Sequence, residues 1–191
     1  MTFARGAGPD AMKRLKLAMY VSLDDVVEEP SWTGPFWNDQ LSELQAEYLY
    51  ASDALVLGRI TYEGFAAAWP SMEESTGDFG RKMNSMPKHV ASRTLTETEW
   101  NATLIEGDVP AAIARLKEDD GGGDLLIYGS GTLVDELTRL RLIDEYRLMV
   151  HPVLVGSGKK LFETIVEPLT LGLEDVKTTD TGVAVLTYTP A

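Results

Sequence analysis

Residues 53–58, with the sequence DALVLG, limit the possible folds more than any other part of the chain. Their apolar residues follow one another without the alternating polar residues of a strand that has one face in water. Such strands are typical of parallel sheets that helices cover on both faces. The segment TYEGFAAAW (61–69) follows with a helical pattern, which Pro70 is expected to end. We therefore expect a βα unit inside an α/β sheet.

Predicted strands and helices alternate along the rest of the chain. Apolar runs predict strands at residues 15–23, 88–92, 103–107, 125–129 and 144–156. Apolar residues at helical spacing predict helices at residues 38–52, 109–119 and 132–142. The tail predicts two strands around TDTG (179–182), a turn signal typical of an antiparallel hairpin. The predicted sheet is therefore mixed, with parallel βα units first and antiparallel strands at the end.

Less regular patterns occur in three segments. Residues 70–87 have no clean period, so we interpret them as a loop with at most one helical turn. Pro152 indicates an edge or a bulge in the strand predicted at 144–156. The stretch GSGKK (156–160) resembles a phosphate-binding loop but lacks its Ser or Thr, and it predicts a turn into a short helix.

Composition excludes several classes of protein and site. The chain has no cysteine, which rules out disulfides and thiolate chemistry and favours a reducing cytoplasm. A net charge of -13 argues against a general nucleic-acid binder, so an anionic ligand would need a local cationic pocket. No apolar run approaches the ~20 residues of a membrane helix. His89 and His151 lie on separate predicted strands, and we expect no metal site.

One domain is expected over residues 15–191, because no repeat or linker divides them. Residues 1–14 are basic and rich in small residues, and we expect them to form a flexible extension.

Two predicted strands end in glycine directly before a helix. These corners are VLGRIT (56–61) and IYGSGTL (127–133). Such a corner points backbone N–H groups outward from the positive end of a helix dipole and can bind phosphate. Because the carboxyl ends of parallel strands share one edge of a sheet, both corners could hold one dinucleotide pyrophosphate. The alternative is structural: the glycines end strands, and Thr61 or Thr132 caps a helix.

A third group, Ser92 and Arg93, follows the strand predicted at 88–92. Arginine can bind phosphate through two parallel hydrogen bonds, and serine adds a hydroxyl donor, so this pair suits a ribose 2′-phosphate. The alternative is an arginine that only faces solvent.

These segments together resemble a known superfamily. VLGRITYEGF, the SR pair and IYGSGTL are similar to segments of dihydrofolate reductases. VSLDD (21–25) and LIDEYRLMVHPVLVGSGKKLF (142–162) resemble the reductase domain of the riboflavin bifunctional deaminase-reductase. The resemblance extends from Leu15 to Pro190. It implies a three-layer αβα sandwich with a central, mostly parallel sheet of about eight strands, usually as a homodimer.

The resemblance also implies a function: hydride transfer from NADPH to a small pteridine-like or aminopyrimidine-like heterocycle. The residues that it assigns to the cofactor are Gly58, Arg59, Thr61, Ser92, Arg93, Gly129, Ser130, Gly131 and Thr132. The nicotinamide would lie near residues 18–20.

Substrate residues are less clearly marked. Dihydrofolate reductases carry a carboxylate early in the helix before the GR strand. The matching position here is Ser42, with the carboxylates of Glu43 adjacent and of Asp39 a turn earlier, so none is a clean match. Asp24 matches the aspartate of the riboflavin branch and is the candidate for catalysis and substrate contact, with a turn residue as the alternative. Trp37 is the candidate stacking wall, with core packing as its alternative. A second function stays open: a nucleotide-binding protein that keeps the fold but lacks a proton-donating site.

Overall fold

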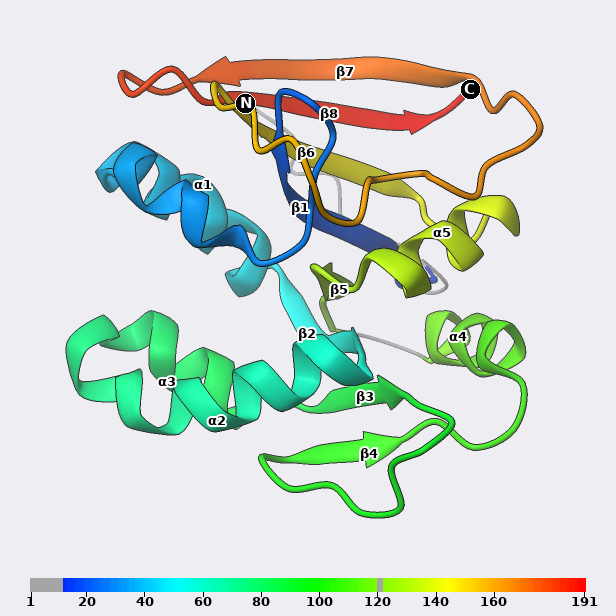
Figure 1. Cartoon of the computed structure of the whole chain (residues 1–191). Coiled ribbons are helices and arrows are strands. Elements are labelled where there is room, and N and C mark those ends of the chain that lie inside the picture. Colours follow the sequence, from blue (N-terminus) through cyan, green and yellow to red (C-terminus); the bar gives the residue numbers. More distant parts are fainter. Residues whose placement is uncertain (1–11, 120–121) are drawn as a thin grey trace, which may run out of the picture.

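The computed structural model describes residues 12–119 and 122–191 of the chain. Residues 1–11, most of the predicted extension, lie outside this description, while Arg14 forms an ion pair with Glu145 at 2.9 Å. Within the described residues, eight strands form one sheet in the order β4-β3-β2-β5-β1-β6-β8-β7 (Figure 1). No helix in this part of the chain is long and apolar enough to cross a membrane.

The strands and helices follow the predicted alternation. The strands are β1 (Leu15–Ser22), β2 (Ser52–Gly58), β3 (Lys88–Ala91), β4 (Ala102–Leu104), β5 (Asp124–Tyr128), β6 (Glu145–His151), β7 (Leu171–Thr178) and β8 (Ala184–Pro190). The helices are the 3₁₀ helix η1 (Pro30–Phe36), α1 (Asp39–Tyr50), α2 (Arg59–Thr76), α3 (Asp78–Ser85), α4 (Val109–Glu118) and α5 (Gly131–Arg139).

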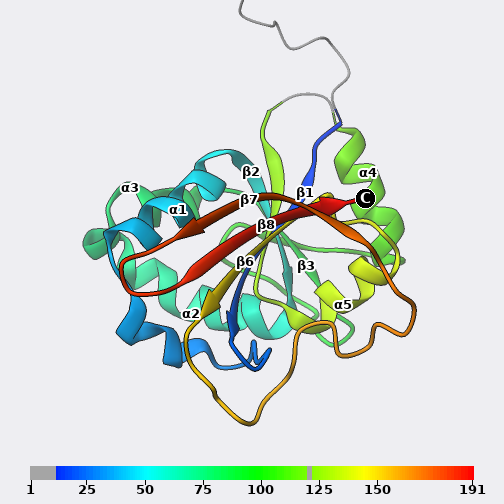
Figure 2. The ribbon, with the colours of Figure 1, turned by 90° about the horizontal axis from the view of Figure 1, so that it is seen from above.

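The sheet is mixed, as predicted. Every neighbouring pair from β4 to β6 is parallel, and β8 runs antiparallel between β6 and β7. The predicted hairpin is thus confirmed as β7 and β8, which lie side by side at one edge of the sheet in both views (Figures 1 and 2).

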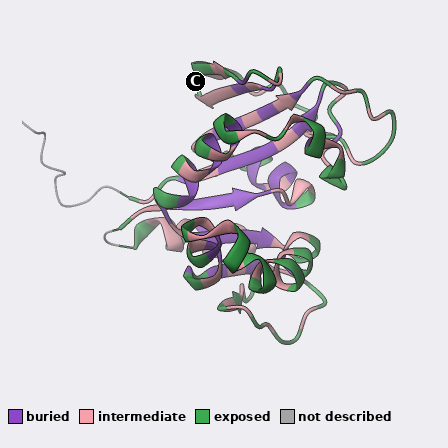
Figure 3. Ribbon diagram, turned by 90° about the vertical axis from the view of Figure 1, so that its left-hand side faces the viewer, coloured by how far each residue is buried: buried purple, intermediate pink, exposed green. Residues whose placement is uncertain are grey.

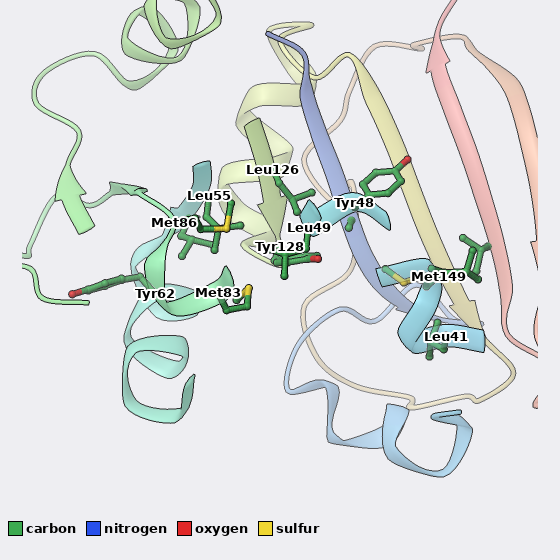
Figure 4. Close-up of a cluster of buried hydrophobic side chains, with 14 of the residues drawn as sticks. Leu41, Tyr48, Leu49, Leu55, Tyr62, Met83, Met86, Leu126, Tyr128 and Met149 are labelled. Atoms are coloured by element: carbon green, nitrogen blue, oxygen red, sulfur yellow. The ribbon is translucent and has the colours of Figure 1, made fainter. Parts of the chain in front are cut away.

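Helices cover both faces of the sheet and give three layers. Leu55 and Leu57 of β2 join a core cluster with residues of α1, α2 and α3. Ala54 and Val56 of the same strand join a second cluster with residues of α4 and α5. Neither face of β2 is wet, which confirms the prediction from its continuous apolar run (Figure 3). Figure 4 shows the first cluster, which includes Tyr128 and Met83; both also line the site described below.

The prediction of a loop at residues 70–87 is wrong, and so is the prediction that the helix ends at Pro70. Helix α2 continues to Thr76, and α3 follows after Gly77, which has a positive φ of 60°. Pro70 lies on the exposed side of the helix, and its missing N–H leaves the carbonyl of Ala66, four residues earlier, without its helical partner. Tertiary contacts hold the second half of α2, because the Asn84 amide donates to the Trp69 carbonyl at 3.3 Å.

The segment after β6 also differs from the prediction. β6 lies between β1 and β8 and ends at His151. Pro152 therefore follows an interior strand, and the predicted edge position or bulge at this proline is wrong. The GSGKK stretch enters no short helix. Instead, Lys160 forms an isolated antiparallel bridge with Val26, which ties this loop to the segment after β1.

Candidate cofactor and substrate cleft

A cleft of about 1500 Å³ lies at the carboxyl ends of the parallel strands. It is lined by Ala18, Met19 and Tyr20 of β1 and by every residue that the resemblance assigned to the cofactor: Gly58, Arg59, Thr61, Ser92, Arg93, Gly129, Ser130, Gly131 and Thr132. These residues meet because β3, β2 and β5 are parallel neighbours in the sheet. The loops that follow the three strands therefore share one edge.

The two glycine corners are hydrogen-bonded to each other. The Gly58 N–H donates to the Ser130 hydroxyl at 2.9 Å, and the Ser130 N–H donates to the Thr61 hydroxyl at 3.1 Å. Gly129 and Ser130 both have left-handed backbone, with φ of 61° and 63°. These two N–H groups are therefore occupied within the protein. These hydrogen bonds fix the two corners against each other, and other N–H groups remain to face a ligand.

The free donors are the first-turn N–H groups of α2 and α5. Asn38 and Asp108 cap α1 and α4 through side-chain hydrogen bonds of 2.9 and 2.8 Å, whereas α2 and α5 have no side-chain cap. Their N-terminal residues line the cleft. Uncapped helix starts combine unpaired N–H groups with the positive end of the helix dipole, which favours an anion.

Arg93 and Ser92 lie at the same edge. Arg93 is exposed and has no ion pair within the described residues, whereas Arg59 pairs with Glu63 at 2.9 Å. The Ser92 hydroxyl accepts the N–H groups of Thr94 and Leu95 at 3.2 and 3.0 Å, and its own O–H stays available to donate. The loop after β3 thus presents a cation and a hydroxyl to the cleft.

Lys159 is a cleft residue that the sequence did not reveal, because GSGKK was interpreted as a structural turn. A Cβ atom on Gly131 would lie 3.1 Å from Cε of Lys159, which places this side chain against the start of α5. Among the described residues, its ammonium forms two long ion pairs, 3.5 Å from the Asp135 carboxylate and 3.6 Å from the Glu163 carboxylate. No local motif signals this position, since contacts with residues 24–28, among them the bridge to Val26, hold the loop beside the cleft.

Asp24 holds this loop in place and does not line the cleft. Its carboxylate accepts the Ser22 hydroxyl at 2.6 Å and the N–H groups of Val155 and Gly156 at 3.0 and 2.7 Å. These hydrogen bonds, that of Ser22 first, lower the pKa of Asp24 to about 2. A carboxyl group that is ionised at neutral pH and engaged in this way is a loop anchor. These contacts favour the alternative role for Asp24, a turn residue after β1, over catalysis or substrate contact.

Trp37 and Glu43 stand at the cleft. Trp37 is 47% exposed, so it is not a core residue, and its ring meets Tyr20 edge-on with centroids 6.2 Å apart. Of the carboxylate candidates, Glu43 and its neighbour Ser42 line the cleft, and Asp39 does not. Glu43 is exposed and has no hydrogen-bond or ion-pair partner among the described residues.

Uncharged polar groups form the floor between these parts. The Gln45 amide donates to the Tyr20 hydroxyl, and the Tyr128 hydroxyl donates to the Gln45 backbone carbonyl at 3.3 Å. Burial raises the pKa of both tyrosines, so they stay protonated at neutral pH. Within the described residues, no group of three or more His, Cys, Asp and Glu side chains is placed to hold a metal ion.

Comparison with known proteins identifies relatives along nearly the whole chain. Residues 13–185 match the family model of the RibD C-terminal domain. The Bacillus subtilis (strain 168) protein YyaP is 26% identical over 178 residues, which cover 92% of this chain and 94% of YyaP.

Solved structures show the same fold. A Shewanella sp. PV-4 protein named "Putative riboflavin biosynthesis protein" superposes with a TM-score of 0.76 at 22% identity, covering 94% of this chain and 99% of that one. The Thermotoga maritima diaminohydroxyphosphoribosylaminopyrimidine deaminase/5-amino-6-(5-phosphoribosylamino)uracil reductase superposes with a TM-score of 0.68 at 14% identity, covering 94% of this chain and 57% of that protein.

Proposed function

The chain belongs to the RibD C-terminal domain family, and from this premise we propose that it is an NADPH-dependent reductase of a pteridine-like or aminopyrimidine-like heterocycle. One observation carries the proposal: the uncapped starts of α2 and α5 line a single cleft that continues to β1, together with Arg93, which has no ion pair within the described residues. A dinucleotide phosphate needs this combination of anion sites along one sheet edge.

The described residues fit each part of the cofactor. The first turns of α2 and α5 would hold the pyrophosphate, and Ser92 with Arg93 would hold the 2′-phosphate. When bound, NADPH supplies a hydride to the carbon of a conjugated C=N or C=O bond; the nitrogen or oxygen takes a proton, and NADP⁺ is released. The protein's own contribution is to orient both rings, with Trp37 and Tyr20 beside the reacting centre and Glu43 accepting N–H groups of the substrate.

Two measurements test this function. Calorimetric titration with NADPH and with NADH should show tight binding of NADPH alone. The NADPH-loaded protein should then oxidise its cofactor with some member of a panel of dihydropterins and aminopyrimidines. Tight binding without turnover across the panel would favour a nucleotide-binding protein that has lost catalysis, and absence of nucleotide binding would refute both functions.

Replacing Lys159 with Met should weaken the binding of NADPH and of NADH by the same factor, about tenfold. Lys159 lies against the start of α5, and its ammonium is 3.5 Å from the buried carboxylate of Asp135 and 3.6 Å from Glu163. A pyrophosphate there would gain one charged contact, worth ~1.5 kcal/mol. Calorimetry with both nucleotides measures the change. Lys160→Met is the matched control, because Lys160 is the adjacent lysine, is exposed and does not line the cleft. A loss confined to NADPH would instead assign Lys159 to the 2′-phosphate.

We also propose that the protein is a homodimer that pairs through the sheet face of β8 and β7 on the α5 side. The strand register places Leu173 and Val176 on the same face as Tyr188 and Leu186. Leu173 and Val176 are 55% and 50% exposed, so the hairpin presents apolar surface on this face. A second copy of the same face would bury both.

The double variant Leu173→Asp/Val176→Asp should sediment as a monomer while the wild type sediments as a dimer. Desolvating two carboxylates in each subunit would cost far more than the apolar contact returns. Lys177→Asp is the control: it changes the net charge by the same amount but lies on the opposite face by register. Equal masses for the wild type and the double variant would remove this face from the dimer.

A further inference from the structure

The basic side chains that line the cleft gather at one of its ends. Among the described residues that line it, the basic ones are Arg59, Arg93 and Lys159, and all belong to the loops and helix starts that surround the cofactor corners. The other end lies between α1 and the α2–α3 pair. It is lined by Glu43 and by the apolar side chains of Phe65, Trp69, Met72 and Phe79.

The buried basic residues next to this end are committed to other partners. Arg147 donates to the Leu44 carbonyl at 2.7 Å, and its guanidinium lies 3.4 Å from the centre of the Tyr48 ring. Lys88 donates to the Asn84 carbonyl at 2.9 Å and lies over the Trp100 ring. Neither residue lines the cleft. An anionic group bound between α1 and α2 would therefore meet none of the basic side chains that line the cleft among the described residues, and it would face the carboxylate of Glu43.

The wall of α2 and α3 suits an apolar substituent. The Phe65 and Trp69 rings meet edge-on with centroids 6.3 Å apart, and Trp69 and Phe79 follow at 5.6 Å. Gly64 lies on α2 between the Gly58 corner and this wall. A Cβ atom on Gly64 would meet no atom within 4 Å, so the space in front of it is open. A ring or alkyl group placed here would exchange water for aromatic surface.

Gln45 provides a matched polar group at the floor. Its side chain is 5% exposed and lines the cleft, and its Oε1 atom is buried without a hydrogen-bond partner among the described residues. A buried amide oxygen without a partner is costly, and a ligand N–H would satisfy it once the Gln45 side chain turns this oxygen toward the cleft. An amide recognises an uncharged N–H edge and supplies no charge to balance an anion.

From these observations we propose that the substrate is an uncharged, N–H-bearing heterocycle with an apolar substituent, and that the site rejects substrates carrying a phosphate or carboxylate on that substituent. The inference rests on the proposed function. It separates this chain from the phosphoribosylated uracil named for the Thermotoga maritima relative.

The test uses two matched pairs of compounds with the NADP⁺-saturated protein. One pair is 5-amino-6-(ribosylamino)uracil and its 5′-phosphate; the other is 6-methyl-7,8-dihydropterin and 7,8-dihydropterin-6-carboxylate. Tryptophan fluorescence reports binding, because Trp37 and Trp69 line the cleft. At least one uncharged compound should bind, and ~10-fold or more tightly than its anionic partner.

Equal or tighter binding of the anionic partners would overturn the proposal. So would a failure of all four compounds to bind a protein that still binds NADPH, and this outcome would leave the cofactor assignment intact. Absence of NADPH binding would instead overturn the proposed function, and the inference with it.

A matched pair of variants tests whether the charge at this end of the cleft causes the preference for uncharged compounds. Met72 is 37% exposed in the apolar wall, so Met72→Lys should fold and add one positive charge to this end of the cleft. It should reduce the preference for the uncharged compound by about tenfold. Glu74→Gln changes the net charge equally on the same helix outside the cleft lining and should leave the preference unchanged. Equal effects of the two variants would contradict a local origin of the selectivity.

Discussion

The Arg93→Ala protein is expected to bind NADPH about a hundredfold more weakly than the wild type and to bind NADH as the wild type does. Arg93 is exposed at the cleft edge and has no ion pair within the described residues, so its guanidinium is free for a 2′-phosphate. Two charge-assisted hydrogen bonds lost at such a site correspond to ~2.7 kcal/mol. Calorimetric titration with each nucleotide measures both constants. The difference between the two cofactors separates a 2′-phosphate contact from general damage to the site.

Arg115→Ala provides the control for this substitution, because Arg115 is exposed on α4 and does not line the cleft. It should leave both dissociation constants unchanged. The alternative holder of the 2′-phosphate is Arg59, which also lines the cleft but already pairs with Glu63 at 2.9 Å. If Arg59→Ala removed the preference for NADPH and Arg93→Ala did not, the assignment would move from the loop after β3 to the start of α2.

The second large effect is expected for Glu43→Gln. This substitution should lower kcat/KM for the heterocyclic substrate by about a hundredfold and leave NADPH affinity unchanged. Glu43 is the carboxylate that lines the substrate end, and it has no partner among the described residues. A carboxylate can accept two parallel N–H bonds from an aminopyrimidine edge, and the amide of Gln replaces one acceptor with a donor. Losing this charged pairing costs ~2.7 kcal/mol of transition-state binding.

Steady-state kinetics with the best substrate of the panel gives this value, and Glu47→Gln is the matched control. Glu47 lies one helical turn further along α1, pairs with Arg147 and Lys177, and does not line the cleft. Unchanged kinetics for Glu43→Gln would assign substrate recognition to Gln45 and the tyrosines of the floor. A rise in the NADPH dissociation constant would show that Glu43 acts on the cofactor end instead.

Patterns that act over a few neighbouring residues predicted most of the fold. The continuous apolar run of 53–58 predicted a strand buried on both faces, and β2 is buried against both core clusters. The TDTG turn predicted the hairpin of β7 and β8. The prediction of a helix end at Pro70 failed because a proline weakens a helix only locally. The contact that holds this part of α2 comes from α3, where Asn84, 15 positions away, donates to the Trp69 carbonyl.

The sequence by itself determined the strand and helix types and the three loops where an anion site could form, because backbone preference and apolar periodicity are local properties. Only the tertiary structure decided how these parts combine. The pairing of β3, β2 and β5 set the three loops on one edge. The hydrogen bond from the Gly58 N–H to Ser130, 72 residues away, occupies a donor that the sequence pattern left open for a ligand. The same holds for Asp24 and Lys159. Contacts across about 130 positions make Asp24 an anchor of the loop that carries Lys159 to the cleft, and no spacing rule describes contacts between segments so far apart in the chain.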